Sequence, residues 1–272
     1  MTMLSINTNI GALNASQSSY SVNNSMETSM ARLSSGNRIN SAADDAAGLQ
    51  IARRMDTEIQ GLNQAVRNAA DAQALLQTAE GALDEVHTIL LRIRELSVQA
   101  SNGTYGAQDR LAIQAEVTDL QSEITRISND TTWNSISLIE GSQSTGITFQ
   151  IGADNTQTVT VAIANIALAT LSIGGTSQVT TATNAMSYIA AVDKAISVIS
   201  TNRGTYAAAI NRLDHSVANM QDAATNLAEA KGRITDADFA AETSNLSRTQ
   251  VLQQASMAMF CLLYTSDAAD ES

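Results

Sequence analysis

The sequence predicts a mainly α fold: a long antiparallel helical bundle or coiled coil built from the N- and C-terminal halves, with a small β-hairpin insert. Three observations lead to this prediction. Apolar residues recur at heptad spacing over long stretches of both halves. The 272 residues include no proline and only 3% aromatic residues, which suits long helices packed through small side chains. A short segment rich in β-branched residues separates the halves.

Residues 1–43 have an amphipathic helical pattern of irregular spacing. Isolated helices of this kind are marginal in water, so we expect this segment to need another surface. That surface is either the similar C-terminal segment or a neighbouring copy. The apolar members of the pattern are Ile10, Leu13, Tyr20, Met26, Met30 and Leu33.

A hinge is predicted where this pattern stops. Gly36 can supply a positive φ after the end of a helix. Ser41 and Asp44 match the S-x-x-D capping pattern, and Asp45 suits the positive end of the following helix.

Residues 44–140 are predicted to form the N-terminal part of the bundle. The glycines of residues 101–106 end a first helix, and a second helix with its own apolar stripe follows. Each stripe needs a partner, so we expect these helices to pack together. The first helix carries two seams, one of Leu62, Ala69, Leu76, Leu83 and Leu90, and one of Ala65, Ala72, Ala79, Val86, Ile93 and Ala100.

Residues 141–182 are predicted to form the β insert. Residues 147–152 and 158–166 flank a turn-like segment and predict a hairpin, with further strand or loop in residues 169–180. The second half of the bundle, residues 183–231, then returns to 3/4 apolar spacing, interrupted by Arg203. Its seam includes Ile196, Ile210, Leu213 and Val217. A last amphipathic helix is predicted over 232–260.

Composition excludes several classes of function. The net charge of −12 and the lack of a basic run argue against nucleic-acid binding. No apolar stretch is long enough to cross a membrane, and the N-terminus lacks the pattern of a cleaved signal peptide. His87 and His215 lie singly beside apolar seams, and no catalytic motif is present. We therefore predict a protein that is not an enzyme, with no catalytic, cofactor-binding or metal-binding residues.

Three stretches resemble bacterial flagellin: INTNIGALNA (6–15), RLSSGNRINSAADDAAGLQIA (32–52) and ITDADFAAETSNLSRTQVLQQASMAM (234–259). The resemblance covers residues 1 to about 260 and implies a short filament subunit without large outer domains. It implies that 1–43 and 232–260 form an inner tube, and 44–140 and 183–231 an outer bundle. It further implies type III export with an export chaperone, secretion, and self-assembly into a helical filament.

A finer resemblance concerns immune recognition. LLRIRELSVQ (90–99) and IQAEVTDL (113–120) are similar to segments through which some flagellins engage Toll-like receptor 5. This implies that Arg92, Leu96, Gln99 and Glu116 are receptor contacts. The alternative is an ordinary solvated face, since Ile93 lies in the bundle seam. Two other functions stay open: a hook–filament junction protein, and a secreted receptor-binding or adhesive protein.

The final segment, CLLYTSDAADES (261–272), departs from the family pattern after about Phe260. One reading frame of a common sequencing-library adapter encodes nearly the same peptide, so we interpret the segment as an artefact and give Cys261 no function. We expect one further helical turn and then fraying from Tyr264. The missing native end leads us to expect impaired polymerisation and chaperone binding.

Overall fold

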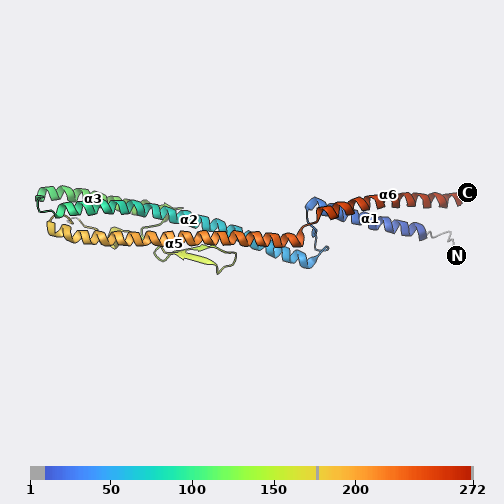
Figure 1. Ribbon diagram of the computed structural model, residues 1–272, viewed down its shortest axis with the longest axis horizontal. Helices are drawn as coiled ribbons and strands as arrows, with labels where there is room; N and C mark the ends of the chain where they lie inside the picture. The colour runs from blue at the N-terminus through green and yellow to red at the C-terminus, as the bar shows by residue number, and fades with distance from the viewer. Residues whose placement is uncertain (1–9, 176–177, 271–272) are drawn as a thin grey trace. The chain divides into compact units, whose positions relative to one another are not determined.

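The computed structural model describes residues 10–175 and 178–270 and confirms the mainly α fold class (Figure 1). The start of the N-terminal segment, two residues of the insert and the last two of the tail lie outside the described residues. The chain divides into two compact units. The bundle unit comprises residues 60–224, and the terminal unit comprises the described residues before 60 and after 224.

Three long helices lie side by side in the bundle unit (Figure 1): α3 (Ala107–Asp130) and most of α2 (Ala46–Ser101) and α5 (Ala182–Thr235). The first residues of α2 and the last residues of α5 belong to the terminal unit. Gln73 Nε2 donates to Asp214 Oδ1 over 2.6 Å, and Arg94 Nε lies 2.6 Å from Asp193 Oδ1. Residue numbers therefore rise along α2 as they fall along α5, so the two helices run antiparallel, as predicted.

The core of the bundle unit follows the heptad pattern. The central seam residues of α2 and α5 are fully buried, and other seam residues are half-buried against them. The fully buried seam residues include Leu76, Leu83, Leu90, Ile93 and Leu213, and the half-buried ones Leu62, Ile196, Ile210 and Val217.

Arg203 interrupts the α5 seam without burying a bare charge. Its Nη2 lies 2.7 Å from Glu80 Oε1, and its Nη1 lies 2.8 Å from Asp84 Oδ1. The guanidinium thus pairs with two partly exposed carboxylates at the edge of the bundle. The hydrogen bond with Glu80, together with the charges of both carboxylates, raises the pKa of Arg203.

The predicted hairpin is present as β3 (Ile147–Gln150) and β4 (Thr158–Val161), which pair antiparallel with Ile147 opposite Val161. A second small hairpin, β1 (Thr132–Trp133) and β2 (Ile136–Ser137), was not predicted and lies within the range assigned to the helical bundle. Strands of two residues are too short to show an alternating pattern. Positive φ at Asn134 and Ser135 forms the tight turn between them.

The rest of the insert corrects one expectation. Residues 168–171 form a single helical turn, α4 (Leu168–Leu171), where strand or loop was predicted. Buried side chains tie this region to the helices. Tyr206 Oη accepts the Ala164 N–H over 2.7 Å, and Tyr188 Oη donates to the Ile173 carbonyl over 2.9 Å. Burial raises the pKa of both tyrosines.

In the terminal unit, α1 (Ile10–Ser35) and α6 (Phe239–Asp270) pair antiparallel (Figure 1). Gln253 Nε2 donates to Asn23 Oδ1 over 2.8 Å, and Arg32 lies opposite Glu242. The helix continues to Asp270, so the expected fraying from Tyr264 is wrong. Residues 261–270 contain no glycine or proline, and their leucines and alanines favour helix.

The hinge between α1 and α2 forms a short backbone ladder with the segment between α5 and α6. Gly36 has φ of +72° and donates to the Arg32 carbonyl over 2.9 Å, which ends α1. The Arg38 N–H donates to the Thr235 carbonyl, and the Ala237 N–H donates to the Gly36 carbonyl.

The cap of α2 is Asp45, four residues after Ser41, which the S-x-x-D pattern marks as the cap. Asp45 Oδ1 accepts the Gly48 N–H over 2.8 Å and caps the helix. Asp44 instead closes a turn before the helix, accepting the N–H (2.8 Å) and hydroxyl (3.0 Å) of Ser41. These bonds lower the pKa of the Asp44 carboxyl.

Candidate assembly and recognition surfaces

Most large apolar side chains of α1 and α6 are exposed. Tyr20 is 70% exposed and Val251 64% exposed. We call the exposed set the outward apolar face; it consists of Ile10, Leu13, Tyr20, Met30, Phe239, Val251, Leu252, Met257 and Met259. Exposed apolar side chains concentrated on one helix pair are typical of an interaction surface.

The contact between α1 and α6 buries few large apolar side chains. Ser29 and Glu242 are its buried residues, and Met26, Leu33 and Leu246 are half-buried. A shallow groove of about 250 Å³ on the same pair is lined by alanines and serines together with Leu252 and Met259. Because little apolar area is buried within the pair, this helix pair has little stability of its own.

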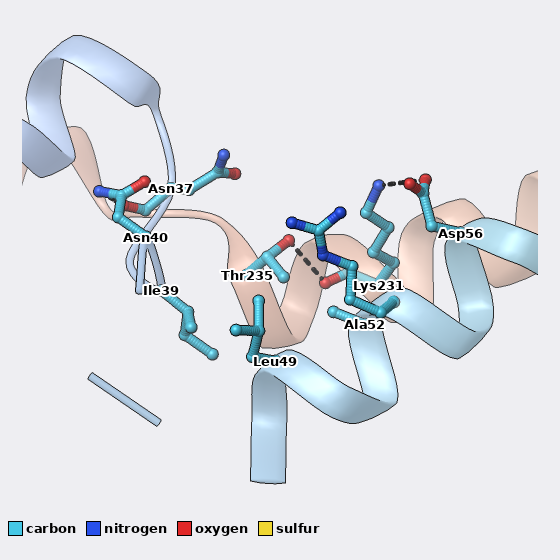
Figure 2. A pocket seen from close by; sticks show the side chains of 9 residues that line it. Asn37, Ile39, Asn40, Leu49, Ala52, Asp56, Lys231 and Thr235 are labelled. Carbon is cyan, nitrogen blue, oxygen red and sulfur yellow. Dashed lines mark hydrogen bonds and ion pairs between the residues drawn. The ribbon is translucent and has the colours of Figure 1, made fainter. Parts of the chain in front are cut away.

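The hinge encloses a pocket of about 230 Å³ (Figure 2). Asn37, Ile39 and Asn40 enter it from the loop, and Leu49 and Ala52 from the first turns of α2.

One ion pair crosses this pocket. Figure 2 shows the Lys231 ammonium directed at the Asp56 carboxylate, 2.6 Å away. The hydrogen bond from Lys231, reinforced by its charge, lowers the pKa of Asp56. The two charges neutralise each other and link α5 to α2, so the pair has a structural role; we call Asp56 and Lys231 the joint residues.

The predicted recognition residues lie where α2 faces α3. Arg92 Nη1 lies 2.6 Å from Glu95 Oε2, and Arg92 Nη2 lies 2.8 Å from Glu116 Oε1. Gln99 is exposed, and its amide donates to Tyr105 Oη over 3.1 Å. The carboxylates, Glu116 first, raise the pKa of Arg92. Three of the four predicted residues therefore form an exposed polar surface.

Leu96 differs from the other three. It is only 2% exposed and belongs to the core, so its assignment to an accessible contact surface is corrected. Its spacing shows why, since Ile93, Leu96 and Ala100 follow one another at 3/4 steps along the buried side of α2.

Neither histidine belongs to a cluster of possible metal ligands in the described part of the chain. His87 is half-buried and His215 is exposed. Among residues 10–175 and 178–270, no group of three or more His, Cys, Asp or Glu side chains could hold a metal ion. No helix in the described part of the chain has the length and apolarity of a membrane span.

Sequence reasoning missed the joint residues Asp56 and Lys231 and the Arg32–Glu242 contact. A usable signal exists for the first pair. The α2–α5 contacts of the bundle keep a nearly constant sum of residue numbers, and continuing that register places Asp56 opposite Lys231.

Comparison with known proteins supports one family. The model for the bacterial flagellin N-terminal helical region matches residues 6–144, and that for the C-terminal helical region matches residues 189–265. A flagellin of Halalkalibacterium halodurans is 42% identical over 255 residues, covering 93% of both chains. A Bacillus subtilis flagellin is 38% identical, covering 93% of this chain and 94% of its own.

Solved structures agree. The crystal structure of Bacillus cereus flagellin is similar with a TM-score of 0.51 and 32% identity, covering 61% of this chain and 94% of that one. A Vibrio parahaemolyticus protein assigned as flagellar hook-associated has a TM-score of 0.60 over 71% of this chain and all of its own. At 14% identity, that second likeness concerns the fold alone.

Proposed function

The chain belongs to the bacterial flagellin family and is a structural subunit of the flagellar filament, and on this premise we propose that the outward apolar face of α1 and α6 contacts neighbouring subunits. The observation that carries the proposal is the exposure of nine large apolar side chains on two helices that bury few large apolar side chains between them. Covering such side chains releases about 25 cal/mol for each Å² removed from water. The helix pair therefore gains in assembly the stability that it lacks alone.

The number of copies that assemble distinguishes a filament subunit from a protein of the hook–filament junction. A filament subunit adds to its own kind without limit, whereas a junction protein occupies a few positions. The test is negative-stain microscopy of the purified chain added to fragmented filaments. Growth into long filaments supports the proposal. Capping without elongation supports the junction alternative only if a chain with a family-type C-terminus in place of residues 261–272 also fails to elongate, because that segment is expected to impair polymerisation.

We also propose that the chain leaves the cell through the flagellar type III export apparatus, with an export chaperone, before it folds. Two observations support this route. The chain belongs to the flagellin family, and α1 and α6 bury few large apolar side chains against each other. Cells that lack the export apparatus should retain the chain inside, while wild-type cells release it. Equal release from both strains would contradict this route.

Recognition by Toll-like receptor 5 is a further proposal, carried by the exposed polar surface of Arg92, Gln99 and Glu116. Arg92 orients both neighbouring carboxylates, so removing it changes the charge pattern without opening the core. This surface would make the protein a receptor ligand in addition to a structural subunit. Binding as the main role, in a secreted adhesive or receptor-binding protein, is the alternative.

A receptor reporter assay with Arg92→Ala tests the recognition proposal. Arg126→Ala is the matched control, because Arg126 on α3 is equally exposed and also pairs with two carboxylates, Glu123 and Asp130. We expect Arg92→Ala to reduce signalling about tenfold, as for loss of one charged contact of 1–2 kcal/mol, and Arg126→Ala to leave it unchanged. Equal signalling by all three proteins would contradict the proposal.

For residues 261–272 we propose a foreign origin, on the likeness of CLLYTSDAADE to a translated adapter. The family match continues to residue 265, a few positions beyond the expected departure at Phe260. Genomic reads across the codon of Phe260 test the origin. Native flanking DNA that runs through Cys261 would contradict it.

A further inference from the structure

A polar cavity of about 310 Å³ lies between α1 and α6, in the layer where α6 begins. Two guanidinium groups, those of Arg32 and Arg248, and one carboxylate, that of Glu242, line it together with hydroxyl and amide side chains. The layer therefore has a local charge of +1, in a chain whose net charge is −12.

The Arg32 guanidinium is incompletely satisfied. Its Nε is buried and has no hydrogen-bond partner. Its Nη1 lies 3.9 Å from Glu242 Oε1, which is too far for a hydrogen bond, although Glu242 is only 8% exposed. A buried donor without an acceptor is costly, so the position favours an additional acceptor in the cavity.

Arg248 is the second donor. It has no ion-pair or hydrogen-bond partner within the described ranges 10–175 and 178–270. Three neighbouring hydroxyls already donate to carbonyls of their own helices, so they offer no further O–H donor to a ligand in the cavity. Ser25 donates to the Ser21 carbonyl, Thr28 to the Asn24 carbonyl and Thr249 to the Asn245 carbonyl.

We propose that this cavity, the Arg32–Arg248 site, binds an oxyanion that bridges α1 and α6. A guanidinium is planar and presents paired N–H donors that match the oxygens of carboxylate or phosphate. An anion here receives a donor from each helix and so stabilises the terminal helix pair. Two sources share this chemistry: free inorganic phosphate, and a carboxylate side chain of a second copy. Only the second source rests on the proposed subunit contacts.

The test follows the thermal unfolding of the full chain by circular dichroism, at a subunit concentration where it is monomeric. Phosphate is titrated against chloride at constant ionic strength. We expect phosphate to raise the unfolding midpoint by a few degrees, since a ligand that binds only the folded state stabilises it. Arg248→Gln should need at least tenfold more phosphate for the same rise. Because Arg248 is exposed and unpaired, the variant should unfold at the wild-type midpoint in chloride.

Arg212→Gln is the matched control, because Arg212 is an exposed arginine on α5 of the bundle unit. A rise in midpoint that is equal in all three proteins would be general salt stabilisation and would overturn the free-anion source. The second-copy source is tested in chloride alone, by raising the subunit concentration. A rise with concentration that Arg248→Gln loses supports a carboxylate from a neighbour.

If neither phosphate nor concentration separates Arg248→Gln from the wild type, the Arg32–Arg248 site binds no oxyanion and the inference is wrong. That result leaves the proposed function standing as long as the chain still elongates filaments.

Discussion

Asp44 and Asp45 are adjacent aspartates with different tasks. Asp45 caps α2 through the Gly48 N–H, whereas Asp44 holds the loop turn that precedes the helix. Both are polar residues that favour helix starts, so the sequence pattern marks the region of the helix start but not the capping residue itself. Which aspartate becomes the cap depends on the turn that Ser41 makes with Asp44, and on the bridge between Asn37 and Asp236 that fixes the loop.

Removing the cap should weaken the terminal unit. We expect Asp45→Ala to lower the free energy of unfolding by about 1 kcal/mol, because the Gly48 N–H loses its acceptor. Asp45→Asn keeps a capping oxygen and should retain most of the stability. Chemical unfolding of the three proteins measures the effect. Equal loss in both variants would show that the charge of Asp45 matters rather than its hydrogen bond.

Asp44 should give the hinge a dependence on acid. Its folded pKa is lowered by the bonds from Ser41 and Asn40, so its contribution to stability is complete above the ordinary aspartate pKa of about 3.9. The contribution is lost as the pH falls through the lowered folded value. An NMR titration of the carboxyl should show the depressed pKa, and Asp44→Asn should remove the acid-sensitive part of hinge stability. An ordinary pKa for Asp44 would contradict this account.

Among the elements, the two kinds of helix pair differ in how well sequence predicts them. In α2 and α5 the large apolar residues form the seam, so heptad spacing alone locates the core. In α1 and α6 small and polar residues such as Ser29 form the contact, and the larger side chains face outward. An amphipathic pattern shows that a helix has an apolar face but not which surface covers it. Leu96 shows a different error. The family resemblance assigned it to the receptor contacts, whereas its heptad position places it in the core.

The bundle seam predicts a strong contrast within one helix. Leu83 is fully buried, while Leu91 on α2 is about half exposed. We expect Leu83→Ala to cost about 2–5 kcal/mol of unfolding free energy, because it removes buried methyl groups and leaves a cavity. The control, Leu91→Ala, should cost less than about 0.5 kcal/mol. Denaturant unfolding of both variants measures the difference, and similar costs would contradict the position of the core.

Tyr206 should anchor the β insert to α5. Tyr206→Phe leaves the Ala164 N–H without its acceptor, which we expect to cost about 1–3 kcal/mol. Hydrogen exchange at Ala164 should accelerate in the variant, while exchange in the centre of α3 stays unchanged. Unchanged protection of Ala164 would show that the Tyr206 hydroxyl does not hold the insert.

At the scale of the whole molecule, the chain combines a bundle unit with a full apolar core and a terminal unit whose large apolar residues are exposed. The first has a continuous buried core, and we propose that the second gains stability when neighbouring subunits cover it. This division follows from the packing and agrees with a family of filament subunits. The helical architecture and the family could be predicted from the sequence, but exposure and pairing distances were needed to identify the surface that we propose for assembly.

The critical concentration for polymerisation tests this central claim most directly. The variant Leu13→Gln/Val251→Gln/Met257→Gln replaces three exposed apolar side chains of α1 and α6 with glutamine, a polar residue that favours helix. The control, Leu111→Gln/Met186→Gln, changes exposed apolar residues of the bundle unit. We predict that the first variant keeps the unfolding midpoint of the monomer but raises the critical concentration at least tenfold, while the control raises it far less. An unchanged critical concentration in the first variant would contradict the assignment of the outward apolar face to subunit contacts.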